Sequence, residues 1–97
     1  MEQSALLTYF STEMRTIDAT APLHRRLRNV IENAVKTGVL KPGAVLPGER
    51  VMAEGLALSR VTVRKALAGL IDHGLLVSLS GQPAAVAPGA AGAEDHR

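Results

Sequence analysis

Residues 59–73 carry the sequence SRVTVRKALAGLIDH, which holds the most regular apolar pattern in the chain. Its apolar residues recur at the i, i+3, i+4, i+7 and i+8 spacing of one helix face. Ser59 is a good N-cap, because its hydroxyl can accept a backbone N–H one turn into the helix, and Gly74 supplies a stop. The pattern therefore predicts an amphipathic helix over residues 60–73. Its predicted buried stripe consists of Val63, Ala66, Leu67, Leu70 and Ile71.

The opposite side of this helix begins with polar and basic residues. The free backbone N–H groups of the helix N-terminus, beside Ser59, can bind a phosphate oxygen. A helix end of this kind also suits the major groove of DNA, where base edges carry distinguishable donors and acceptors. We expect Arg60 to flank the buried stripe. The residues expected to point outward are Val61, Thr62, Arg64, Lys65 and Ala68.

A short helix is expected upstream, over residues 49–56, and a tight turn joins it to the helix over residues 60–73. Two helices so joined are the elements of a helix-turn-helix. The short helix is expected to bury Met52, Ala53 and Leu56 and to expose Glu49, Arg50 and Glu54.

A longer helix is expected over residues 23–35. Pro22 suits its first turn, where the missing N–H would be unpaired anyway, and Gly38 supplies a left-handed stop. Between this helix and the short one, the Pro-Gly pair at 42–43 predicts a turn, and residues 45–46 a short extended piece. The apolar face of the helix is predicted to hold Leu23, Leu27, Val30, Ile31, Ala34 and Val35.

The two ends of the chain add a hairpin, a tail and one more helix. Residues 75–79 and 84–86 have strand-like patterns around a turn at 80–83, which predicts a small β-hairpin. The Ala/Gly-rich residues 88–97 predict a flexible linker or tail. Near the start, Leu6, Phe10, Met14 and Ile17 predict an amphipathic helix, either as extra core or as a dimer contact.

These elements predict a mainly α fold with a small β-hairpin, in which a three-helix bundle carries the hairpin as a wing. The chain has 97 residues, of which 46% are hydrophobic and 21% charged, as in one ordinary globular domain. We expect an N-terminal extension over residues 1–20, a winged helix-turn-helix domain over 21–87 and a tail over 88–97.

Composition also excludes several kinds of chemistry. The chain has no Cys, which removes disulfides and thiolate nucleophiles. Its three histidines share no ligand spacing, so we expect no metal, no cofactor and no enzyme activity. No apolar run approaches the roughly 18 to 20 residues that cross a bilayer. We expect no secretory signal, because residues 1–3 begin no basic stretch ahead of a long apolar run. We therefore expect a cytoplasmic protein without a membrane partner.

Positive charge is concentrated in the middle of the chain. The net charge is only +2, yet residues 22–65 hold nine basic residues against three acidic ones, a balance of +6. Such an excess predicts a positive face and a polyanion partner. Charge alone favours a solvated helix face for the basic residues of the helix over residues 60–73, and only the surrounding sequence pattern reverses that preference. For Arg25, Arg26 and Arg28, solubility or a marginal phosphate contact is the favoured interpretation.

Residues 40–67, LKPGAVLPGERVMAEGLALSRVTVRKAL, closely resemble the GntR family of bacterial transcription regulators. The family carries a loop of the form L-x-P-G-x-x-L-P-S-E-R, a helix that begins E-L-A, and an S-R-x-T-V-R recognition helix. The resemblance extends over residues 22–86. It implies a winged-helix domain that binds double-stranded DNA at an inverted-repeat operator as a homodimer, most often as a repressor. Family members continue into an effector domain that senses a small molecule, so this chain either lacks that domain or acts alone.

The resemblance also implies which residues meet DNA. Arg50 matches the arginine at the start of the short helix over residues 49–56, and Ser80 and Gly81 match the tip of the wing. Arg60 and Arg64 match base or phosphate readers. The matching recognition positions are Ser59, Arg60, Val61, Thr62 and Arg64, to which the exposed face adds Lys65.

Three departures from the family pattern bear on this interpretation. Gly48 replaces the usual Ser and loses a capping side chain. Ala57 stands where a Gly is common, so the turn must avoid a positive φ or carry strain. The wing has no basic residue, which predicts shape and backbone contacts there. A winged helix that binds proteins and never touches DNA is the alternative, whereas a fragment of a regulator fused to an aminotransferase would need residues that the chain lacks.

Overall fold

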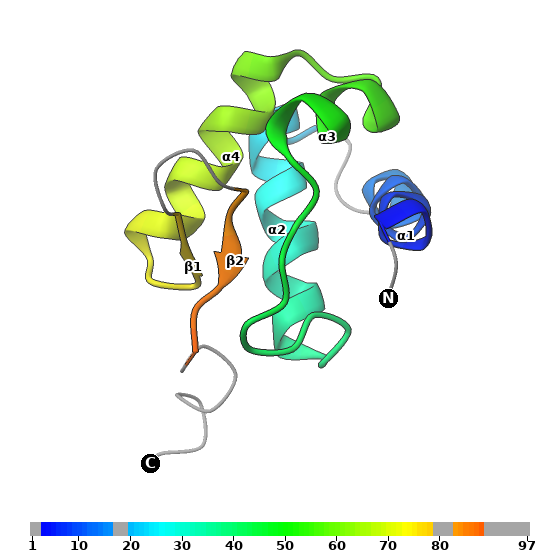
Figure 1. The fold of residues 1–97 in the computed structure, drawn as a ribbon. Coiled ribbons are helices and arrows are strands. Elements are labelled where there is room, and N and C mark those ends of the chain that lie inside the picture. The colour runs from blue at the N-terminus through cyan, green and yellow to red at the C-terminus, as the bar shows by residue number, and fades with distance from the viewer. Residues whose placement is uncertain (1–2, 17–19, 79–82, 89–97) are drawn as a thin grey trace.

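Four helices and a two-stranded sheet make up the computed structural model, which describes residues 3–16, 20–78 and 83–88 (Figure 1). The expected mainly α fold with a small hairpin is confirmed. The elements in chain order are α1 (Gln3–Thr16), α2 (Leu23–Lys36), α3 (Glu49–Leu56), α4 (Arg60–Asp72), β1 (Leu76–Val77) and β2 (Ala85–Val86).

Helix α2 forms the centre of the core. It packs against α4 on one side and α1 on the other, with the hairpin beside α4 (Figure 1). The core is almost wholly aliphatic, and burial of one large apolar side chain contributes about 1.5 to 3 kcal/mol. The largest side chains without exposure are Phe10, Leu27, Ile31, Val35, Leu46, Met52 and Val63.

Helix α1 belongs to this core. Leu6, Phe10 and Met14 are buried in the same cluster as the apolar faces of α2 and α4. Of the two interpretations of the N-terminal stripe, the described residues support extra core, and Ile17 lies outside them.

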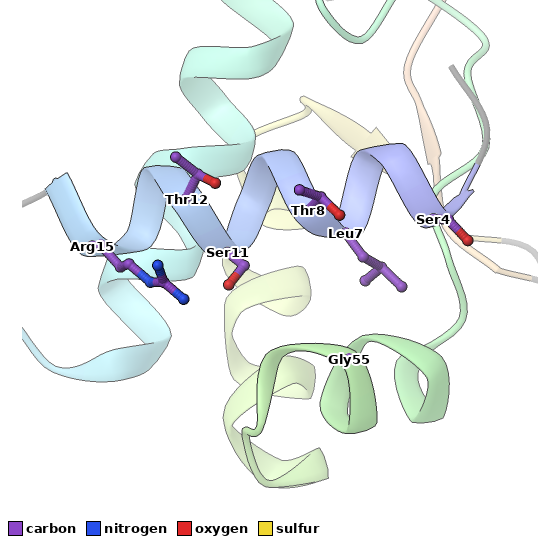
Figure 2. Close-up of a pocket in the computed structure, with 7 residues that line it drawn as sticks. All are labelled: Ser4, Leu7, Thr8, Ser11, Thr12, Arg15 and Gly55. Carbon is purple, nitrogen blue, oxygen red and sulfur yellow. The ribbon is translucent and has the colours of Figure 1, made fainter.

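An open groove runs along α1 where this helix lies against Gly55 of α3. Gly55 permits the close approach of the two helices, because a Cβ there would lie 3.0 Å from a methyl carbon of Leu7. Above Gly55, the hydroxyl-bearing side of α1 runs along a cavity of about 530 Å³ (Figure 2). The cavity is lined by Ser4, Leu7, Thr8, Ser11, Thr12, Arg15 and Gly55.

Two apolar positions predicted to be buried are exposed. Ile71 is 38% exposed and Leu23 is 42% exposed, which corrects the predicted stripes. The buried face of α4 is centred between Val63 and Ala66, and Ile71 lies about 80° round the helix from Val63. Leu23 is the first residue of α2, at the edge of the bundle. Leu67, about 40° from Val63 on the same side as Ile71, is half-buried for the same reason. Leu56 is half-buried as the last residue of α3.

Helix ends largely follow the predicted signals. The backbone N–H of Thr62 donates to the Ser59 hydroxyl, which confirms the N-cap of α4. Gly74 has a φ of +79° and ends that helix. Pro22 is the N-cap of α2 rather than a residue of its first turn, because its ψ of 150° is extended. Its carbonyl accepts backbone N–H groups from Arg25 and Arg26, both at 3.0 Å.

The hairpin acquires a third segment from the loop before α3. Strands β1 and β2 pair antiparallel, with Leu76 opposite Val86 and Val77 opposite Ala85. Val45 forms a bridge with Ala85, so the extended piece predicted at 45–46 lies against β2. Both strands are shorter than predicted, and residues 79–82, which include Ser80 and Gly81, lie outside the described residues.

Candidate nucleic-acid interface

A three-residue turn, residues 57–59, joins α3 to α4. Ala57 adopts φ 57° and ψ 43°, the left-handed conformation, and its N–H donates to the carbonyl of Ala53. The backbone N–H of Leu58 donates to the same carbonyl at 2.9 Å. The sequence left two possibilities for this turn: to avoid a positive φ or to carry strain. Because Ala57 has a positive φ, the turn carries strain, which for an L-residue is about 1 to 2 kcal/mol. The turn directs the first residues of α4 away from the core.

The first turns of α4 present the predicted residues outward. Val61 is 59% exposed, while Val63, two positions later, has no exposure. Thr62 is half-buried beneath the N-cap. The remaining predicted residues of this surface, all exposed, are Arg50, Ser59, Arg60, Arg64 and Lys65. The inside-outside orientation expected of this helix is therefore present.

The hydroxyls of Ser59 and Thr62 form a small cap at the helix N-terminus. The Ser59 Oγ accepts the Thr62 N–H at 3.0 Å and donates to Thr62 Oγ1 at 2.9 Å. Both functions of the Ser59 hydroxyl are thus used within the cap. The Thr62 hydroxyl accepts this bond, so its own proton remains available for a further acceptor such as a phosphate oxygen.

Glu49 joins the two arginines that the sequence analysis selected on α4. Its Oε2 accepts from Arg64 Nε at 3.0 Å, and its Oε1 accepts from Arg64 Nη2 at 2.8 Å. Arg60 Nη2 reaches the same Oε1 at 3.5 Å. These pairs bring together residues 11 and 15 positions apart in the chain.

The carboxylate of Glu49 is held in its charged form. Hydrogen bonding to Arg64, with a smaller contribution from Arg60, lowers the pKa of Glu49 below its ordinary 4.5, and partial burial opposes this only in part. The same hydrogen bond raises the pKa of Arg64. Sequence reasoning placed Glu49 on the exposed side of α3 but missed its role, because the pairing depends on how α3 and α4 cross.

The other basic residues of this surface differ in their partners. Arg50 Nε lies 3.3 Å from Glu54 Oε2, one turn along α3. Lys65 has no ion pair among the residues that the structure describes. Exposed pairs of this kind contribute only about 0 to 1 kcal/mol each, so a phosphate group can displace them.

Two of the three arginines of α2, Arg26 and Arg28, contact other parts of the fold. Arg26 Nε donates to the carbonyl of Ala21 at 3.1 Å. The side chain of Arg28 lies against Gly69, where a Cβ would come within 3.1 Å of two of its atoms. These contacts agree with the interpretation that α2 does not read bases.

Neither a metal site nor a membrane span emerges from the described residues. Within them, no group of three or more His, Cys, Asp and Glu side chains is placed to hold a metal ion. None of the helices in that part of the chain is long and apolar enough to cross a bilayer.

Similar proteins are known for most of the chain. The HTH-type transcriptional regulator GgaR of Escherichia coli (strain K12) is 36% identical over 83 residues, which cover 84% of this chain and 33% of GgaR. The HTH-type transcriptional repressor NagR of Bacillus subtilis (strain 168) is 39% identical over 61 residues, which cover 63% of this chain and 25% of NagR. The chain thus spans a quarter to a third of the length of these relatives.

A solved structure and a family model agree with these relatives. The structure of AraR(DBD) in complex with operator ORX1 matches with a TM-score of 0.66 and 30% identity, over 69% of this chain and 81% of that one. This likeness confirms the winged-helix fold. Residues 23–86, about two thirds of the chain, match the model described as "Bacterial regulatory proteins, gntR family". The chain therefore belongs to the gntR family of bacterial regulatory proteins.

Proposed function

We propose that this chain binds double-stranded DNA in a sequence-specific manner, as the DNA-binding part of a transcription regulator that acts as a repressor. The observation that carries the proposal is the two-sided character of α4. Val63 is sealed in the core, while Arg60, Arg64 and Lys65 project into solvent from the same turns. The operator complex of AraR(DBD) and the repressor name of NagR support this function.

Each residue of the surface has a role in this proposal. Arg60 and Arg64 read bases in the major groove or bind its phosphates, and Lys65 binds the flanking phosphate. Thr62 donates its hydroxyl to a phosphate, while Ser59 holds the helix N-terminus in place. Val61 offers an apolar contact of the kind that a thymine methyl accepts. Arg50, at the start of α3, contacts the DNA backbone on the side where α3 lies. Ser80 and Gly81 contact the DNA backbone through the wing.

The assembly follows from the symmetry of duplex DNA. A homodimer would read an inverted repeat, with half-site centres about 10 base pairs apart. A small-molecule effector belongs to the proposal only if a ligand-sensing domain accompanies this one. The proposed place of action is the cytoplasm, and catalysis has no part in the function.

Selection from a random duplex pool, followed by sequencing, tests the proposal directly. The full chain should enrich one motif with two-fold symmetry. Gel shifts with Arg60→Ala and Arg64→Ala should then show weaker binding of that motif. Lys36→Ala is the matched control, because it also removes one positive charge but from the far end of α2 (Figure 1). Absence of any enriched motif contradicts the proposal.

A protein-binding winged helix is the second candidate, favoured by the neutralised arginines. Glu49 and Glu54 already pair with three of the four basic residues of the surface. A surface of this kind has less net charge than the sequence count suggests. The gel shift at low salt separates the candidates, because a protein-binding module retains no duplex under those conditions.

A further inference from the structure

We propose that Glu49 is a specificity-determining residue of this surface: it positions Arg64 to read a base and disfavours phosphate at the same guanidinium. This inference rests on the proposed DNA binding by α4. Glu49 itself would touch no base. It acts through Arg64 and, to a smaller extent, through Arg60.

The geometry of the pair leaves the reading edge of Arg64 open. Glu49 takes the Nε–H and one Nη2–H of the guanidinium, at 3.0 Å and 2.8 Å. An arginine has five N–H donors, so both Nη1–H groups and the second Nη2–H remain. This terminal edge carries two parallel donors, which match the O6 and N7 acceptors of guanine. Arg64 can thus be held by Glu49 and read guanine at the same time.

The carboxylate is a firm support because it belongs to a different helix. Glu49 begins α3, whose Met52 and Ala53 are buried in the core. The side chain of Glu49 is 26% exposed, against 64% for Arg64. The carboxylate therefore lies closer to the protein interior than the guanidinium that it holds. An arginine already held in one orientation loses less conformational freedom on binding.

The charge of Glu49 discriminates between two kinds of ligand. A phosphate that approaches Arg64 also approaches the carboxylate and is repelled, whereas guanine presents neutral acceptors. Arg60 shares Oε1 at 3.5 Å and is subject to the same bias. Contacts to phosphate supply nearly all of non-specific DNA binding. Glu49 is therefore expected to weaken binding to random sequence more than binding to the preferred site.

The test compares two duplex probes of equal length: one selected by the wild-type chain from a random pool, and one of random sequence. We expect Glu49→Gln to bind the random duplex several-fold more tightly. The ratio of the two affinities should fall by about tenfold, near the lower end of what one bidentate base contact discriminates. The salt dependence on random duplex should steepen by up to about one unit, because Arg64 is released to a phosphate.

Two further variants separate the contributions. Glu32→Gln makes the same charge change on α2, where Glu32 pairs with Lys36 at 3.4 Å, and should leave the affinity ratio unchanged. Glu49→Asp keeps the charge but shortens the reach. It should weaken binding to the selected duplex while the random duplex stays weakly bound. Thermal melting of each variant verifies that the domain is folded.

Two results would overturn the inference. One is an unchanged affinity ratio in Glu49→Gln, which includes an equal loss on both probes. The other is an effect of Glu32→Gln on the ratio as large as that of Glu49→Gln. Failure of the proposed function is a different result, since in that case the wild-type chain selects no motif at all.

Discussion

The Ser59 hydroxyl accepts the backbone N–H of Thr62 at 3.0 Å and donates to its side-chain oxygen at 2.9 Å. One side chain thus satisfies a free donor of α4 and orients the Thr62 hydroxyl. The cap lies at the junction of the core and the proposed DNA surface, so its removal affects both stability and binding.

We expect Ser59→Ala to lower the free energy of unfolding by about 1 kcal/mol, the usual cost of losing an N-cap. Chemical denaturation measures this change. Ser59→Asn is the control, because Asn caps as well as Ser, and it should restore most of the stability. Equal losses in both variants would show that the hydroxyl does not act as a cap.

Ala57→Gly should stabilise the domain. Ala57 is the only non-glycine residue with a positive φ in the described ranges 3–16, 20–78 and 83–88. Glycine removes a steric cost of about 1 to 2 kcal/mol, and its greater freedom in the unfolded chain offsets about half of this gain. A net gain near 0.5 to 1 kcal/mol should raise the melting temperature by a few degrees. A lower melting temperature than that of the wild type contradicts the left-handed turn.

Phe10→Ala should show that α1 is an integral part of the domain. Phe10 has no exposure and belongs to the core cluster. Loss of such a side chain costs about 3 to 5 kcal/mol, which is a large share of the stability of a small domain. Thr8→Ala, on the exposed side of the same helix, is the control and should change stability by less than about 0.5 kcal/mol. A cooperative melt at the wild-type temperature for Phe10→Ala would mean that α1 is dispensable.

Arg60→Ala should weaken binding to the selected duplex. If Arg60 reads a base, loss of that contact should cost about 1 to 3 kcal/mol of binding free energy and should relax the base preference at one position of the site. Binding of the variant to duplexes altered one base pair at a time measures both quantities. A loss that is equal on all sequences would assign Arg60 to a phosphate.

The Glu49 pair makes stability depend on acid pH. The pKa of Glu49 is lowered in the folded chain, so its contribution is fully present above its ordinary value of 4.5. It is lost as the pH falls through the lowered folded pKa. The difference in unfolding free energy between wild type and Glu49→Gln should therefore be constant above pH 4.5. It should shrink as the pH falls through the lowered folded pKa. At about 1 M salt, where the screening length is about 3 Å, the difference should shrink.

Local signals account for most of the predicted fold. Helical periodicity located α2, α3 and α4, and Ser59 and Gly74 marked two helix ends, because these preferences act over a few neighbouring residues. The opposite orientations of Val61 and Val63 also followed from the sequence, since adjacent helix positions differ by about 100°. Local signals could not determine how much of each apolar helix face is buried by neighbouring elements. Ile71 was exposed because burial depends on the neighbouring helix and the sheet.

The sequence by itself determined the elements, their apolar faces and the basic residues at the start of α4. Only the tertiary structure decided that Glu49 holds Arg64 and Arg60, that Ala57 is left-handed, and that Val45 pairs with Ala85. The first set depends on contacts within one or two helical turns. The second depends on how separate segments cross, because a carboxylate meets two arginines 11 and 15 residues away only after α3 has packed against α4.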